Sequence, residues 1–132
     1  MTPLGSVAII AHDAGGAEIL SSWIRRNPRR CMLVLGGPAK DIFQRKVPHL
    51  PVAKLNDAIK ECDWVLTDTG AGGGQLQFDG VVMAKANCQY VVSFIDHWSC
   101  YRERFLRNGL QVLPDEIWVG DKDALTLVKH KI

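Results

Sequence analysis

Three apolar, β-branched stretches each end abruptly in polar residues, and this recurrence limits the folds open to the chain. The stretches span residues 6–11, 64–67 and 90–95, and they are followed by His12-Asp13, Asp68-Thr69 and Asp96-His97. Uninterrupted apolar runs of this length are typical of strands buried on both faces of a parallel sheet. In open α/β sheets, ligands bind beyond the carboxyl ends of such strands. The sequence therefore predicts a single polar rim where these strands end.

Strand and helix patterns alternate along the whole chain. Further strands are expected at 31–35, 52–54 and 116–119, and helices at 15–26, 39–46, 56–61 (capped by Asn56), 77–87, 99–107 and from 122 onward. Such alternation with short connections indicates α/β architecture, a parallel sheet with helices on both faces. We expect a doubly wound, mainly parallel, Rossmann-like sheet of about six strands in the order 3-2-1-4-5-6. There is no repeat or linker, so residues 1–132 are expected to form one domain.

The bulk composition excludes several classes of protein. A hydrophobic fraction of 47% with 23% charged residues argues against disorder, and a net charge of +2 gives no indication of nucleic-acid binding. No apolar run approaches the ~20 residues that span a bilayer, and no signal peptide is recognisable, so we expect a cytoplasmic protein without membrane contact. The four cysteines form no C-x-x-C pair and no zinc-type spacing with the histidines. We therefore expect reduced thiols, no metal and no resident cofactor.

The segment AHDAGGAEI places Gly15 and Gly16 at a turn from strand to helix. Glycines there allow a ligand to approach the backbone, and the helix amino terminus attracts anions. The G-x-G-x-x-G pattern and its later acidic residue are missing, which disfavours dinucleotide binding. His12 is a candidate ligand-binding residue, the alternative being a packed histidine. Asp13 is a candidate catalytic residue, the alternative being a helix cap.

The segment TDTGAGGGQ is a second glycine-rich turn. A nest of backbone N–H groups there can hold a phosphate or carboxylate, and the alternative is a simple turn. The Lys-Ser/Thr ending of a P-loop is absent, so an NTPase is disfavoured. The candidate ligand-binding residues of this turn are Asp68, Thr69, Gly70, Gly72, Gly73 and Gly74.

The segment DHWSCYRERF carries the most specific signal. Asp96 and His97 follow a buried strand, and either Asp96 or Asp68 can orient His97 for acid–base catalysis. Arg102 is a candidate ligand-binding residue on the helix expected next. The alternative is a structural helix start with Asp96 as its cap.

Together, HDAGGAEIL, TGAGGG, FIDHWSCYRERF and LPDEIWVGDKDA resemble the amino-terminal half of two-lobed sugar-nucleotide proteins. These proteins include the glycosyltransferase-B enzymes and the non-hydrolysing nucleotide-sugar 2-epimerases. The resemblance implies a lobe that binds acceptor or sugar, while a second lobe binds most of the nucleotide. Because the second lobe is absent from this sequence, full transferase activity is not expected.

The sequence thus predicts a domain that binds a small molecule, namely an anion, a sugar phosphate or a nucleotide sugar. One alternative is a small epimerase- or hydrolase-like enzyme that uses the strand-end Asp and His residues. Another is a pure protein-interaction module, and the sequence leaves open whether any reaction is catalysed. An amphipathic final helix with Leu125, Val128 and Ile132 on one side predicts a homodimer, or else a partner that supplies the missing lobe.

Overall fold

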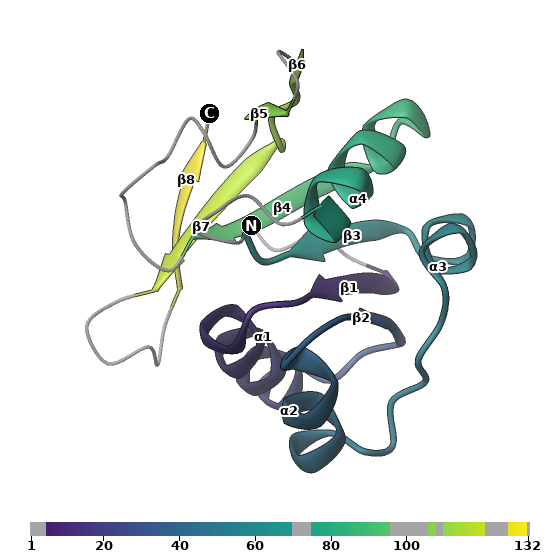
Figure 1. Cartoon of the computed structure of the whole chain (residues 1–132), viewed down its shortest axis with the longest axis vertical. Coiled ribbons are helices and arrows are strands. Elements are labelled where there is room, and N and C mark those ends of the chain that lie inside the picture. The colour runs from purple at the N-terminus through teal and green to yellow at the C-terminus, as the bar shows by residue number, and fades with distance from the viewer. Residues whose placement is uncertain (1–4, 70–74, 96–105, 108–109, 121–126, 132) are drawn as a thin grey trace.

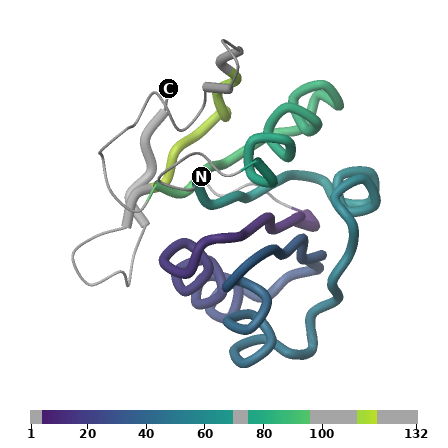
Figure 2. Tube along the Cα trace, viewed as in Figure 1, coloured from purple at the N-terminus to yellow at the C-terminus, as the bar shows by residue number. Residues whose placement is uncertain are grey.

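The computed structural model describes residues 5–69, 75–95, 106–107, 110–120 and 127–131 (Figures 1 and 2). Within these ranges the helices are α1 (Ala14–Arg26), α2 (Ala39–Lys46), α3 (Leu55–Glu61) and α4 (Gln75–Ala86). The strands in the same ranges are β1 (Val7–Ala11), β2 (Cys31–Leu35), β3 (Trp64–Thr67), β4 (Tyr90–Ile95), β5 (Leu106–Arg107), β6 (Leu110–Gln111), β7 (Glu116–Gly120) and β8 (Leu127–Lys131).

The main sheet runs in the order β2-β1-β3-β4-β7-β8. Its first five strands are parallel, and β8 pairs antiparallel with β7. Strands β5 and β6 form a separate antiparallel pair. An α/β fold built on a parallel sheet is thus confirmed. Because β1 lies between β2 and β3, the chain changes direction across the sheet at β1, and the carboxyl ends of β1 and β3 are neighbours.

Helices cover both faces of this sheet, as Figure 1 shows, with α1 and α2 on one face and α3 and α4 on the other. Alternate residues of β1 supply the two cores. Val7 and Ile9 pack toward α1, whereas Ala8 and Ile10 pack toward α3 and α4. Each of these side chains is fully buried. A strand covered on both sides has no polar face, which explains the uninterrupted apolar run in the sequence.

An aromatic cluster joins the first helix to distant strands of the sheet. Trp23 of α1 lies with its ring centroid 6.0 Å from that of Trp64 on β3 and 5.4 Å from that of Trp118 on β7. The ring centroids of Trp64 and Trp118 are 6.2 Å apart. The guanidinium of Arg29 lies 4.9 Å from the centroid of Trp23, within the range of a cation–π contact.

Most of the predicted elements in the first two thirds of the chain are present, with two corrections. The expected strand at 52–54 is only an isolated bridge between Val52 and Leu33, so the parallel strands number five rather than six. Pro51 has no N–H to donate, and the backbone hydrogen bonds that join this segment to β2 both involve Leu33. Asn56 does not cap α3, because the cap position is Lys54 and Asn56 lies within the helix.

The expectations for the last third of the chain fit the structure less well. A helix was expected from residue 122, but residues 127–131 form β8, since β7 offers a free edge for backbone pairing. The predicted helix at 99–107 is wrong at its end, where Leu106–Arg107 is strand β5. Residues 99–105 lie outside the described ranges. Because the amphipathic final helix is not formed at 127–131, the argument for a homodimer loses its basis.

Two further observations concern membrane contact and thiol chemistry. None of the helices in the described ranges is long and apolar enough to cross a bilayer. The thiols of Cys31, Cys62 and Cys88 are free. Burial raises the pKa of Cys31 to about 12, so this thiol is neutral and a poor nucleophile near neutral pH.

Candidate functional site

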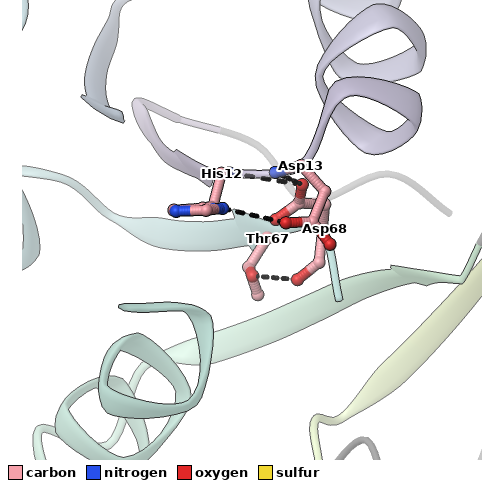
Figure 3. Close-up of polar contacts among 4 residues, drawn as sticks. All are labelled: His12, Asp13, Thr67 and Asp68. Carbon is pink, nitrogen blue, oxygen red and sulfur yellow. Dashed lines mark hydrogen bonds and ion pairs between the residues drawn. The ribbon is translucent and has the colours of Figure 1, made fainter. Parts of the chain in front are cut away.

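The carboxyl ends of β1 and β3 bring together the polar residues that follow these two strands. The backbone N–H of Asp68 donates to the carbonyl of Ile10, with an N–O distance of 3.1 Å. This bond extends the β1–β3 pairing by one step beyond Thr67. Figure 3 shows the resulting group, in which His12 and Asp13 lie beside Asp68.

Asp68 is the most deeply buried charged side chain of this group, with no solvent-exposed surface. Its Oδ2 accepts hydrogen bonds from the backbone N–H groups of His12 (3.3 Å) and Asp13 (3.2 Å). Its Oδ1 is also buried but has no hydrogen-bond partner. A buried polar atom left unpaired costs about 1–3 kcal/mol. Asp68 Oδ2 is therefore held by two hydrogen bonds, whereas Oδ1 has no partner.

This environment changes the ionisation of Asp68. Burial is the main cause that raises its pKa from 3.8 to about 7, and the charge of Asp13 raises it further. The backbone N–H of His12 and the nearby side chain of Gln77 act in the opposite direction. The Gln77 amide is thus near Asp68, although it makes no hydrogen bond of acceptable geometry. Near neutral pH this carboxyl is close to half protonated, so it can either donate or accept a proton.

Gly16 is explained by the position of Asp68. A Cβ atom on Gly16 would lie 2.4 Å from the Cβ of Asp68 and 2.5 Å from its Oδ2. The missing side chain therefore allows the carboxyl of Asp68 to sit against the first turn of α1. The sequence predicted an external anion at this turn, and an internal carboxyl lies there. Gly15, the other glycine of the turn, is exposed.

His12 and Asp13 form a pair at the surface of the site. The Nδ1 atom of His12 lies 2.9 Å from Oδ1 of Asp13, and the side chains are 45% and 42% exposed. A carboxylate only accepts hydrogen bonds, so the Nδ1 proton is directed to Asp13 and Nε2 is the nitrogen left for a ligand. Asp13 occupies the N-cap position of α1, but its side chain makes no capping hydrogen bond.

The glycines after β2 make room for the His12 ring. A Cβ on Gly36 would lie 2.9 Å from Cδ2 of His12, and one on Gly37 would lie 2.7 Å from Cε1. Gly37 also has a φ of +47°, which side chains other than glycine rarely adopt. No local pattern in the sequence indicates that these two glycines make room for the His12 ring.

Two threonines at the site are engaged with the backbone. The hydroxyl of Thr67 donates to the carbonyl of Asp68, and that of Thr69 donates to the carbonyl of Phe94 at 3.1 Å. Thr69, a predicted ligand-binding residue, thus ties the end of β3 to β4. Its hydroxyl has a structural contact, which is sufficient reason for its burial.

The other predicted site residues lie outside the described ranges, and the structure says nothing of them. They are Gly70, Gly72, Gly73, Gly74, Asp96, His97 and Arg102. Within the ranges that are described, no three or more His, Cys, Asp or Glu side chains gather as a metal site would require.

Two buried side chains near the site were missed by sequence reasoning. Gln77, in the first turns of α4, is only 3% exposed, and both polar atoms of its amide lack a hydrogen-bond partner. Ser93, on β4 beside Thr67, is fully buried, and its hydroxyl is also unpaired. The available signals were a glutamine just after the glycine-rich turn and a serine inside an apolar strand.

Comparison of the chain with protein-family models, with curated proteins and with solved structures finds no match.

Proposed function

We propose that this domain binds a small polar ligand, of the sugar-phosphate or nucleotide-sugar class, beyond the carboxyl ends of β1 and β3. The observation that carries the proposal is the unpaired Oδ1 of Asp68, buried where open α/β sheets bind their ligands. Burying a carboxyl oxygen without a hydrogen-bond partner destabilises the fold, so such a group is expected to have a role other than folding. The sugar class comes from the resemblance of the strand-end motifs to two-lobed sugar-nucleotide proteins.

Calorimetric titration of the whole chain tests the proposal, with uridine diphosphate glucose, glucose 1-phosphate and inorganic phosphate as probes. We expect saturable binding of at least one sugar-bearing probe. The variant Asp68→Asn keeps the size of the side chain and an acceptor for the two backbone N–H groups. It should weaken binding about tenfold or more, because a hydrogen bond to a charged group contributes about 1.5–3 kcal/mol.

Asp57→Asn is the matched control, since Asp57 is an exposed residue of α3. It makes the same change of charge away from the site and should leave binding unchanged. Absence of saturable binding for every probe would refute the proposed function. Binding of inorganic phosphate as tight as that of the sugar-bearing probes would replace the sugar class with a simple anion.

A second candidate function is acid–base catalysis on the same ligand. It is favoured by a carboxyl with a pKa of about 7 beside a histidine–aspartate pair. In this version His12 Nε2 and Asp68 exchange protons with ligand hydroxyl groups, and Asp13 holds the His12 ring in place. Turnover of a bound probe that Asp68→Asn and His12→Gln each abolish would establish the enzyme, whereas binding without turnover would leave the domain a binding module.

A further inference from the structure

Unpaired buried polar atoms concentrate beside the carboxyl end of β3. They come from three successive elements: Oδ1 of Asp68 after β3, both amide atoms of Gln77 on α4, and the hydroxyl of Ser93 on β4. Thr67 and Ser93 are register partners in the sheet, so Ser93 lies one strand away from the end of β3. Gln77 is near enough to Asp68 to affect its ionisation. These atoms thus belong to one region of the fold.

Gln89, a partly buried glutamine elsewhere in the fold, shows what a structural amide looks like, although its Oε1 is unpaired. Nε2 of Gln89 donates to the carbonyls of Ile59 (2.8 Å) and Cys62 (2.7 Å), and so ties the end of α3 to the turn before β4. Gln77 makes no such bond with either of its amide atoms. An apolar side chain of the same length at position 77 would fill the space without leaving polar atoms unpaired. The amide is therefore unexplained by folding.

We infer that Gln77 is a binding residue that, with Asp68, recognises a hydroxyl group on the neutral, polyhydroxylated part of the ligand. A hydroxyl both donates and accepts, so it can pair with an amide N–H and with a carboxyl oxygen at once. This inference rests on the proposed function and assigns the sugar part, rather than the phosphate part, to the end of β3.

The charges around Asp68 support a hydroxyl over a phosphate. The backbone N–H groups of His12 and Asp13, which directly precede α1, already donate to Asp68 Oδ2 and are not open to an anion. Asp13 adds a second carboxyl close by, and no lysine or arginine is among the described groups that shift the pKa of Asp68. A phosphate would meet like charges at this point, whereas a hydroxyl would not.

The variant Gln77→Met tests the inference with two readouts. Methionine has similar length and helix propensity and no amide. Without ligand, we expect the melting temperature to rise by about 3 °C, because the unpaired polar atoms are gone. Binding of glucose 1-phosphate should weaken about tenfold, the loss expected for one hydrogen-bonding group, while binding of inorganic phosphate should not change. Gln75→Met, an exposed position two residues earlier on α4, is the matched control and should alter neither readout.

Monodeoxy analogues of glucose 1-phosphate give a second measurement that does not depend on the variant's stability. With the wild-type protein, at least one analogue should bind about tenfold more weakly than the parent sugar phosphate. The same analogue should lose little further affinity in Gln77→Met, because the two changes remove one shared contact. Equal binding of every analogue to the wild type would overturn the inference.

The remaining outcomes separate the inference from the proposed function. A Gln77→Met protein that is less stable than the wild type, or that fails to fold, would make the amide a structural group, for instance one paired through a buried water. Wild-type binding of sugar phosphate that Gln77→Met leaves unchanged contradicts the inference alone. Failure of the wild type to bind any probe contradicts both.

Discussion

Among the described residues, two acidic side chains are buried, and their surroundings differ sharply. Glu116, at the start of β7, is 3% exposed, and both of its carboxyl oxygens accept hydrogen bonds. Oε2 accepts from the hydroxyl of Tyr90 at 2.7 Å, and Oε1 accepts from Nε1 of Trp118 at 2.8 Å. Asp68, at the end of β3, uses only one oxygen and leaves the other unpaired.

This difference distinguishes a structural carboxyl from the carboxyl of a candidate site residue. Glu116 joins β7 to β4, and the hydrogen bond to Glu116 is the main cause that raises the pKa of Tyr90 to about 12. Burial is compensated there by complete pairing. At Asp68 burial is compensated only in part, and its carboxyl takes up a proton more readily as a result. Three experiments test this difference between Glu116 and Asp68.

The largest effect is expected for Glu116→Leu. This change takes an acceptor from both Tyr90 and Trp118, so the free energy of unfolding should fall by about 4 kcal/mol, as for other broken buried networks. Urea denaturation measures the fall. Glu116→Gln keeps the length and one acceptor oxygen and should lose clearly less. A loss under about 1 kcal/mol for Glu116→Leu would mean that pairing both carboxyl oxygens contributes little to stability. The stated difference between Glu116 and Asp68 would then be refuted.

The next effect concerns the pH dependence of Asp68. Its pKa is higher in the folded than in the unfolded chain, so the stability that it contributes is present below about pH 4 and is lost as the pH rises through about 7. The asparagine of Asp68→Asn does not ionise. Between pH 5 and pH 8 the variant should therefore gain about 2.5 kcal/mol relative to the wild type.

Denaturation curves of both proteins at several pH values measure this gain, and contributions from groups common to both cancel. Asp57→Asn, exposed on α3, should show no such trend. A constant difference between Asp68→Asn and the wild type across this range would show that Asp68 is ionised throughout, as an ordinary paired carboxylate is.

The smallest effect is expected from two helix glycines. Gly16→Ala places a Cβ 2.4 Å from Cβ of Asp68, next to the backbone, so the carboxyl must move away from its N–H donors. We expect a loss of about 1–2 kcal/mol, after the gain in helix propensity from glycine to alanine. In Gly80→Ala the single close contact of the new Cβ, also at 2.4 Å, is with the terminal methyl of Ile10, which can rotate aside. Its stability should stay within about 1 kcal/mol of the wild type, and equal losses at both positions would show that Asp68 is not tightly held.

The strands and helices that the sequence predicted well are those fixed by local pattern. The runs at 7–11 and 64–67 are apolar because helices cover both faces, and the positions of His12 and Asp68 at the strand ends follow directly. The sequence also predicted that the first strand lies next to the strand that ends at Thr67, and this pairing is observed. Here connection rules for parallel sheets are enough, since few arrangements satisfy them.

The features that could not be predicted from the sequence depend on tertiary contacts. Residues 127–131 carry spacing compatible with a helix, and only the free edge of β7 makes them a strand. The contact between Gly16 and Asp68 joins positions far apart in the chain, so it leaves no local pattern. The unpaired amide of Gln77 is visible only once its neighbours are known. Glycine at 16 also makes room for the side chain of Asp68, which no local pattern indicates.

The tryptophan cluster has a consequence for how this protein can be observed. Indole rings with centroids 5.4–6.2 Å apart couple their electronic transitions, so Trp23, Trp64 and Trp118 should give an exciton couplet in circular dichroism. The couplet exists only while α1, β3 and β7 are docked together. The fourth tryptophan, Trp98, lies outside the described ranges. Circular dichroism of the indole transitions thus reports the packing of β7 against α1, without any label and whatever the strand ends bind.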